Sequence, residues 1–370
     1  MKLLTDPPDV VHGQHPFDTA AACLRFPRTP AVYACHGWEP WLETPLTLAS
    51  VRRYVAVSQL TRERLATSGV PSERIAVIPN FVDLGRFSLR RDASARVKRA
   101  LVYGNAWRPD APAFFAIREA CFRRGVELEG VGYGFGRPTD RPQELLASFD
   151  VVFALGRSAL EAMACGCAVI LAGPQGFGGL VTRESFQRQR AANFGLSLIV
   201  AQAVTAARVG QSLDRYEASE VSSVADLVRA EAGLEEALDR WEEQYRLAIA
   251  EGPAPLAEVV ADASAHLVKL KALTFHFERD YARLAAQLSE LKVHAAGLTG
   301  EGEDLRAELT AAKSERDAAL KRLAEVESHN AALSSWTAEL LAKVIRLETP
   351  MRKRLGRKFR DAVKPKNRRR

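Results

Sequence analysis

Short apolar segments alternate with helical stretches through the first half of the chain. Each apolar segment is continuous, a pattern typical of strands that are buried on both faces of a parallel sheet. Helices are expected between them, for example at Leu60–Ser68, Pro112–Arg124 and Ser158–Cys165. The alternation predicts an α/β fold of parallel βαβ units. The expected strands are Asp9–Gly13, Ala31–Gly37, Tyr54–Ser58, Arg74–Asn80, Ala100–Asn105, Leu128–Gly134, Asp150–Gly156 and Ala168–Gly173.

These segments fall into two groups, which predicts two Rossmann-like parallel-sheet domains. The first is short and covers residues 1–82. The second covers residues 83–255, where the pattern becomes helical after Gly173. The stretch 83–97 is expected to connect the two sheets.

A long α-helical coiled coil is expected over residues 256–349, a stretch without proline. Apolar positions there recur at alternating steps of four and three, which is the spacing of a coiled-coil seam. Either a pair of long helices or a helical hairpin that turns near residues 297–302 fits this pattern, as does an intramolecularly packed helix. The seam predicts a homo-oligomer and runs through Ala319, Leu323, Val326, Asn330, Leu333, Thr337, Leu340, Val344 and Leu347.

Composition excludes several classes of protein. Apolar residues make up 47% and charged residues 26% of the 370 residues, as in ordinary globular proteins. No apolar run is long enough to span a bilayer, and no hydrophobic segment follows the first lysine. We therefore expect a cytoplasmic protein with reduced, buried cysteines. These are Cys23, Cys35, Cys121, Cys165 and Cys167.

Positive charge is concentrated at the C-terminal end. The whole chain has a net charge of +7. Residues 350–370 alone carry +10, so the remaining residues together have a net charge of −3. Leu355, Phe359 and Val363 recur at four-residue steps among the cations, which favours attachment to an anionic membrane surface on the inner side. A disordered tail is the alternative. Nucleic acid is the weaker prediction, because no aromatic residues are interleaved in a recognition motif.

One strand, turn and helix could bind an anionic sugar derivative. Glu161 follows a buried strand and a turn at Gly156–Ser158, so its carboxylate is expected in the first turn of a helix. There it could accept hydrogen bonds from two adjacent sugar hydroxyls, while the helix N-terminus, with Arg157 and Ser158, meets a diphosphate. The alternative needs no ligand, because Ser158 and Glu161 also have the spacing of a capping box.

Glycines end another predicted strand. At Gly132 and Gly134 the backbone could approach a donor phosphate closely, although such a turn can also simply lead into a helix.

Four stretches together resemble the retaining, nucleotide-sugar-dependent glycosyltransferases with two facing Rossmann-like domains, GT-B group 4. They are PDVVHGQHP at Pro8–Pro16, AVYACHG at Ala31–Gly37, the segment Val55–Phe87, and GRSALEAMACGCAVIL at Gly156–Leu171. The resemblance implies retention of configuration, no cofactor and no obligatory metal. It also implies Glu161 on the donor ribose and His36 near the transferred sugar.

The sequence departs from this family in three places. Phe153 stands eight positions before Glu161, where the family usually has a second glutamate. Where the family has an Arg and a Lys, the loop here has Asn105 and Arg108, which leaves Arg108 as the expected cation, with Arg157 from the adjacent loop. Residues 1–82 match only half of a first domain, so we expect either a start upstream of Met1 or an acceptor site built differently.

These observations predict a glycosyltransferase that moves a sugar from a nucleotide-sugar donor to a growing saccharide or a lipid-linked acceptor. The alternative is an inactive glycosyltransferase-like scaffold or binding protein, oligomerised by its coiled coil. A nucleotide-sugar epimerase of the same shape is a third hypothesis, and Phe153 argues against it because proton transfer would need carboxylates.

Overall fold

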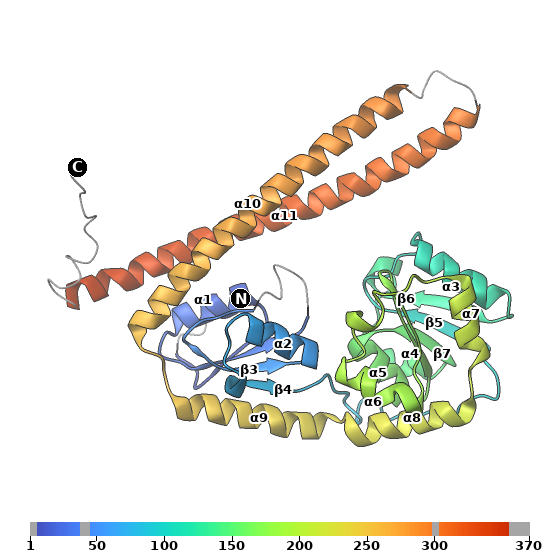
Figure 1. Cartoon of the computed structure of the whole chain (residues 1–370), viewed down its shortest axis with the longest axis horizontal. Helices are drawn as coiled ribbons and strands as arrows, with labels where there is room; N and C mark the ends of the chain where they lie inside the picture. Colours follow the sequence, from blue (N-terminus) through green and yellow to red (C-terminus); the bar gives the residue numbers. More distant parts are fainter. Residues whose placement is uncertain (1–5, 38–44, 298–302, 355–370) are drawn as a thin grey trace. The chain divides into compact units, whose positions relative to one another are not determined.

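The structure is a computed structural model that describes residues 6–37, 45–297 and 303–354 (Figure 1). It divides into two compact units. One comprises Met1–Ala31, Glu39–Val51 and Gly252–Arg370, and the other Val32–Trp38 and Arg52–Glu251. The N-terminal residues thus group with the C-terminal helices, a division that differs from the contiguous domains expected from the sequence.

The first sheet has four strands in the order β1-β2-β3-β4. The apolar pattern is reflected in burial, because all five residues of β2 are buried. β3 and β4 pair in parallel, with Tyr54 opposite Ile75. The strands are β1 (Val11–Gly13), β2 (Ala31–Cys35), β3 (Val51–Ala56) and β4 (Ile75–Val77), and the helices between them are α1 (Pro16–Arg25), α2 (Gln59–Thr67) and the short 3-10 helix η1 (Ser72–Arg74).

The second sheet has five strands in the order β6-β5-β7-β8-β9. The pairs β5–β6, β5–β7 and β7–β8 are parallel, which confirms the predicted α/β class. The last strand pairs antiparallel with β8 and has no counterpart in the sequence prediction. The strands are β5 (Arg99–Tyr103), β6 (Glu127–Val131), β7 (Val151–Ala154), β8 (Ala168–Gly173) and β9 (Gly176–Leu180).

Helices cover both faces of this second sheet (Figure 1). Successive residues of β7 point to opposite faces, so Val152 packs in one apolar cluster with α5, while Phe153 packs in the other with α3 and α7. The helices are α3 (Pro112–Phe122), α4 (Pro142–Leu146), α5 (Gly156–Ala164), α6 (Arg183–Ala191), α7 (Ala206–Asp214) and α8 (Ala218–Glu231), with 3-10 helices η2 (Tyr133–Phe135) and η3 (Leu196–Leu198). The next helix, α9 (Leu234–Glu251), belongs to neither apolar cluster.

Asp150, just before β7, anchors the segment that enters the second sheet. Its Oδ2 accepts hydrogen bonds from the backbone N–H groups of Lys98 (2.7 Å) and Arg99 (2.9 Å). Its Oδ1 accepts from Arg91 Nη2 (2.5 Å) and Ser94 Oγ (2.7 Å). Burial raises the pKa of this carboxyl, but the four hydrogen bonds more than offset it and hold the pKa below its ordinary value.

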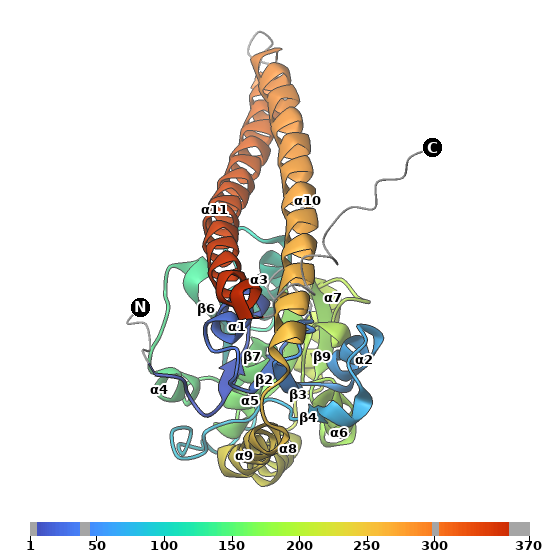
Figure 2. The ribbon, with the colours of Figure 1, turned by 90° about the vertical axis from the view of Figure 1, so that its left-hand side faces the viewer.

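Two long helices, α10 (Leu256–Gly297) and α11 (Glu303–Arg354), pack side by side (Figure 2). Of the arrangements left open by the sequence, the described residues show two helices of one chain packed on each other. Every predicted seam position from Ala319 to Leu340 is buried or half-buried, and Leu333 and Leu340 are fully buried. The Tyr281 hydroxyl also donates to Glu327 Oε1 at 2.8 Å. The predicted homo-oligomer stays a prediction.

The helix α1 packs against both long helices. Leu24 of α1 meets Ala263 and Leu340 in a buried cluster. The rings of Phe17 and Trp336 contact each other edge to face, with centroids 5.1 Å apart. This cluster joins the N-terminal segment to the far end of the described chain.

All five cysteines are free and buried, as expected. Among the described helices, none combines the length and the apolar character needed to cross a membrane. The prediction that the basic tail attaches to a membrane falls mostly on residues 355–370, which lie outside the described residues.

Candidate functional site

Glu161 lies on α5, directly after the central strand β7. The helix begins at Gly156, whose φ of +54° lets the chain turn sharply out of the strand, and the Gly156 N–H donates to Phe194 O at 2.8 Å. Because Glu161 is the sixth residue of α5, it lies in the second turn, and the expected first-turn position is wrong. The N-cap is Leu155, which makes no side-chain cap, so the Ser158–Glu161 capping box does not form at this helix start.

The Glu161 carboxylate is nearly buried and has few partners. Its side chain is 11% exposed, on a helix whose other residues from Ala159 to Ala164 are apolar and buried. The Tyr103 hydroxyl, at the end of β5, donates to Glu161 Oε2 at 3.1 Å. Arg157 Nε lies 3.4 Å from Oε1. The arrangement brings a carboxylate, a phenol and a guanidinium together at the carboxyl ends of two adjacent parallel strands.

A second cation also acts on this carboxylate. Burial raises the pKa of Glu161, against which the Tyr103 hydrogen bond and the charges of Arg157 and Arg86 lower it, and the net shift is upward. Arg86 is itself positioned by hydrogen bonds to Gln143 Oε1 (3.2 Å) and Asp140 O (2.7 Å). Arg157 is thus in contact with the carboxylate, while Arg86 acts on it only through its charge.

Tyr103 is held in its neutral form. Burial raises the pKa of its hydroxyl first, and the nearby charge of Glu161 and the hydrogen bond to it raise the pKa further. The side chain of Ser158 also interacts with this hydroxyl. At neutral pH the phenol is thus a permanent donor, and Glu161 an acceptor that is short of partners.

The structure brings together Glu161, Arg157 and Ser158, which the sequence grouped by spacing. Sequence reasoning missed Tyr103 and Arg86, because both come from distant stretches of the chain. Tyr103 had a detectable signal, since it lies near the carboxyl end of the predicted strand Ala100–Asn105, where binding loops gather. Arg86 lies in the connecting segment, where no local pattern marks it.

The predicted glycine turn has a packing explanation. A Cβ at Gly132, whose φ is +142°, would lie 2.3 Å from Gly104 O. A Cβ at Gly134 would lie 1.8 Å from Trp107 O. Asn105 Oδ1 accepts the Tyr133 N–H at 3.3 Å and ties the loop after β5 to the loop after β6. The glycines allow these two loops to touch, and their contact with a donor stays a prediction, as does that of Asn105.

The other predicted site residues are not among the partners of Glu161 described above. Arg108 pairs with Asp110, its Nε 3.1 Å from Oδ1, and both side chains are exposed. His36 is exposed and lies in the loop that follows β2, a strand of the first sheet. Phe153 is fully buried and packs with α3 and α7, in the cluster on the face of the sheet opposite α5. The roles of His36 and Arg108 stay predictions.

Metal ligands do not gather in the described residues. Within residues 6–37, 45–297 and 303–354, no three His, Cys, Asp or Glu side chains are arranged to hold a metal ion. That the chemistry needs no metal or cofactor stays a prediction.

Comparisons with known proteins give one family match. The model of Glycosyltransferase Family 4 matches residues 1–86, which hold the first sheet and end at Arg86. No curated protein matches the chain.

Three solved structures illustrate the similarity to known folds. HepE from Anabaena, in complex with UDP, is 13% identical over 64% of this chain and 78% of its own, with a TM-score of 0.42. The UDP-GlcNAc 2-epimerase of Neisseria meningitidis, bound to UDP-GlcNAc, is 12% identical over 64% and 75%, with a TM-score of 0.39. The glycotransferase of kitacinnamycin is 15% identical over 65% and 76%, with a TM-score of 0.36.

Proposed function

We propose that the chain is a glycosyltransferase that binds a nucleotide-sugar donor at the Glu161 site. The observation that carries the proposal is the nearly buried Glu161 carboxylate, which accepts from Tyr103 and pairs with Arg157 at the carboxyl ends of β5 and β7. A buried carboxylate with few donors is costly unless a ligand supplies the missing hydrogen bonds. Adjacent hydroxyls of a ribose supply two, and the neighbouring cations suit a diphosphate.

Each residue then has a stated role. Glu161 accepts hydrogen bonds from the ribose, and Tyr103 orients its carboxylate. Arg157 and Arg86 take the place of the paired cations that neutralise the leaving diphosphate, because a guanidinium binds phosphate oxygens with two parallel hydrogen bonds. This assignment moves the electrostatic role away from Arg108, which already has Asp110 as its partner. His36 is retained near the transferred sugar.

The finer points of the proposal rest on the resemblance of the sequence motifs. The match of residues 1–86 to Glycosyltransferase Family 4 supports a transferase in general. Retention of configuration, and a saccharide or lipid-linked acceptor, are proposed because Gly156–Leu171 resembles the donor-binding segment of retaining enzymes. The sugar and the nucleotide are chosen by loop shape, so both UDP and GDP belong in the first test.

Calorimetric titration of UDP and GDP into the full chain tests donor binding. We expect one of them to bind, and Glu161→Gln to weaken it by about 1–3 kcal/mol, because the ribose hydroxyls lose a charged acceptor. A matched control is Glu242→Gln, since Glu242 also pairs with an arginine four residues away on a helix but is exposed. Equal affinity in the wild type and Glu161→Gln, or no binding of either nucleotide to the folded chain, would refute the assignment.

One observation favours the alternative, a scaffold that binds a nucleotide but does not transfer sugar. The position eight before Glu161 holds the buried Phe153, so no carboxylate from that position can contact a donor sugar. The two functions differ in turnover. The two functions can be separated by incubating the chain with UDP-sugars and GDP-sugars and measuring the free UDP or GDP that is formed. A scaffold binds the nucleotide-sugar without cleaving it, so no free nucleotide accumulates.

A further inference from the structure

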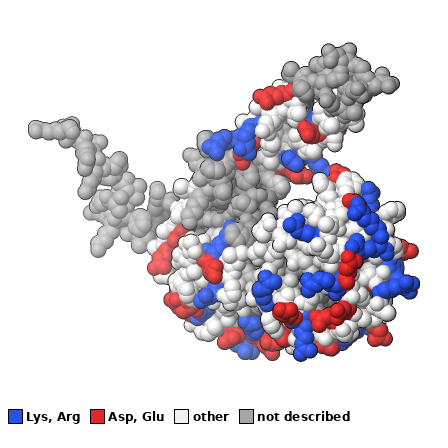
Figure 3. Space-filling model, turned by 45° about the vertical axis from the view of Figure 1, so that its right-hand side comes forward, with Lys and Arg blue, Asp and Glu red and all other residues white. Residues whose placement is uncertain are grey.

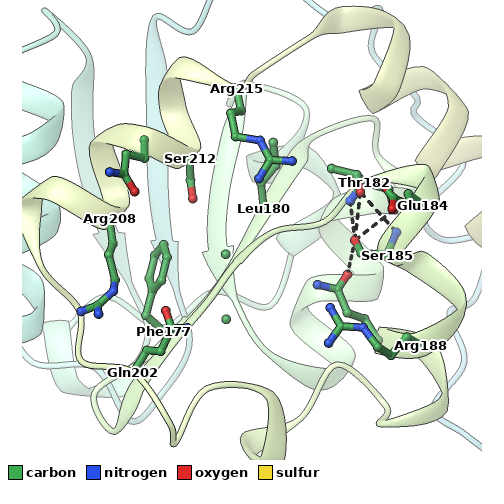
Figure 4. A pocket seen from close by; sticks show the side chains of 14 residues that line it. Phe177, Leu180, Thr182, Glu184, Ser185, Arg188, Gln202, Arg208, Ser212 and Arg215 are labelled. Carbon is green, nitrogen blue, oxygen red and sulfur yellow. Dashed lines mark hydrogen bonds between the residues drawn. The ribbon is translucent and has the colours of Figure 1, made fainter.

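A polar hollow lies along β9, the edge strand of the five-stranded sheet opposite β6. It has a volume of about 480 Å³ and is formed by β9, α6, α7 and the segment around residue 202 (Figure 4). It shares no lining residue with the Glu161 site.

The charge of this hollow is strongly positive. Three guanidinium groups, from Arg188, Arg208 and Arg215, face a single carboxylate, Glu184, which leaves a net charge of +2. In Figure 4, Arg208 and Arg188 lie on opposite sides of the hollow and Arg215 extends from α7 above them. Elsewhere acidic and basic side chains are interspersed over the visible face of the molecule (Figure 3). Among the residues that line the hollow, basic side chains thus outnumber acidic ones three to one.

Two of the three cations are available to a ligand. In the described part of the chain, the guanidinium groups of Arg188 and Arg215 make no hydrogen bond or ion pair. Arg208 has only a long contact, from Nη1 to Ala203 O at 3.3 Å. Guanidinium groups around a concave surface attract anions, and they bind phosphate oxygens with paired hydrogen bonds.

Neutral hydrogen-bonding groups fill the space between the cations. Gln189 is only 2% exposed, and its Oε1 accepts from Ser185 Oγ at 3.0 Å. Ser212 is buried too, and its hydroxyl points into the hollow (Figure 4). Gln202 and Gln211 add two further amides. Such groups act as both donors and acceptors, so they suit a polyol better than a bare anion.

The helix terminus beside the hollow does not supply the positive charge. Thr182 and Ser185 close a capping box in which each side chain accepts the other's backbone N–H. The N–H of Arg183 is occupied by Glu220 Oε2 at 3.0 Å. Anion affinity at this hollow therefore comes from side chains, and it can be removed by substituting them.

We propose that this hollow is a binding site for a small phosphorylated polyol, such as a sugar phosphate, separate from the donor site. The two partnerless arginines bind the phosphate dianion, and the amides with Ser212 bind the hydroxyl groups. The volume is larger than inorganic phosphate requires, which matches a ligand with a sugar-sized body.

Calorimetry on the full chain tests the proposal with three probes: glucose 1-phosphate, inorganic phosphate and glucose. We expect glucose 1-phosphate to bind most tightly, phosphate more weakly and glucose not at all. Arg188→Gln and Arg215→Gln should each weaken glucose 1-phosphate at least tenfold. Both side chains are exposed, so both variants should keep the wild-type melting temperature and circular dichroism.

Two controls make the result specific. Arg246→Gln removes an exposed arginine of α9 and should leave affinity unchanged. Arg157→Gln should also leave it unchanged, because Arg157 is the phosphate-binding cation that contacts Glu161, and a loss of affinity would instead place the probe at the donor site. The proposal is overturned if glucose 1-phosphate does not bind, or if Arg188→Gln and Arg215→Gln bind it like wild type. Equal affinity for phosphate and glucose 1-phosphate overturns the polyol part.

Discussion

Replacing Asp150 by alanine should cost the fold a large part of its stability. Its buried carboxylate accepts four hydrogen bonds, two of them from the backbone N–H groups of Lys98 and Arg99. Without it, these two N–H groups have no acceptor within the sheet, and each unsatisfied buried group costs about 1–3 kcal/mol. Arg91 is 18% exposed, so water can partly replace its lost partner. We therefore expect a loss of about 3–5 kcal/mol, the range for breaking a buried ion pair.

Urea unfolding followed by tryptophan fluorescence measures this loss, and hydrogen exchange localises it. The amides of Lys98 and Arg99 should lose protection in Asp150→Ala, because their acceptor is gone. A matched control is Asp214→Ala, since Asp214 also pairs with an arginine, Arg124, but is 61% exposed. Water screens an exposed pair and can replace the lost partner, so this control should unfold nearly like wild type.

The pH dependence gives an independent check on Asp150. Because its pKa is lowered in the folded state, its contribution is present above the unfolded pKa of about 3.9 and is lost as the pH falls through the folded pKa. The stability difference between wild type and Asp150→Ala should be constant from pH 7 to 5 and shrink below about pH 4. Two results would contradict this role for the Asp150 hydrogen bonds. One is that Asp150→Ala lowers the free energy of unfolding by less than about 1 kcal/mol. The other is that the difference between the two proteins already shrinks between pH 7 and 5.

Three further predictions concern other parts of the chain. Leu340→Ala should cost about 2–5 kcal/mol and expose α1 to limited proteolysis, because Leu340 is buried against α1 and α10; unchanged cleavage would contradict this packing. Burial raises the pKa of Glu161, so the folded chain favours the protonated side chain and loses stability as the pH rises and Glu161 ionises. Glu161→Gln, which stays neutral, should therefore melt at a higher temperature than wild type at pH 8 and at the same temperature near pH 4. Gly134→Ala should destabilise strongly, since its Cβ would lie 1.8 Å from Trp107 O, whereas Gly233→Ala, with 3.5 Å to the nearest atom, should be tolerated in the same melting assay.

Sequence patterns predicted the elements whose signal is local. The continuous apolar strands are found in two sheets, since burial on both faces leaves a clear mark on composition. The strand β9 was missed because Gly176, Gly178 and Gly179 make up most of it, and glycine has low β propensity. Its existence depends on pairing with β8, which no local pattern encodes.

The site shows the same limit. Glu161, Arg157 and Ser158 could be grouped from sequence because one helix carries all three. Tyr103 and Arg86 join them only through the parallel register of β5 beside β7 and the path of the connecting segment. The heptad seam of α11 likewise identified the inward-facing residues, but the same spacing serves a partner helix from this chain or from another.

The cluster of Leu24, Ala263 and Leu340 has a consequence for how the protein is made. The helix α1 leaves the ribosome early, yet its packing partner in α11 follows roughly 300 residues later, a delay of about 15–60 s at ordinary rates of synthesis. Throughout that interval α1 lacks the part of its native cover that α11 supplies. Contacts of such long sequence separation also fold slowly. The newly made chain therefore passes through a prolonged stage in which chaperones have an exposed apolar helix to bind.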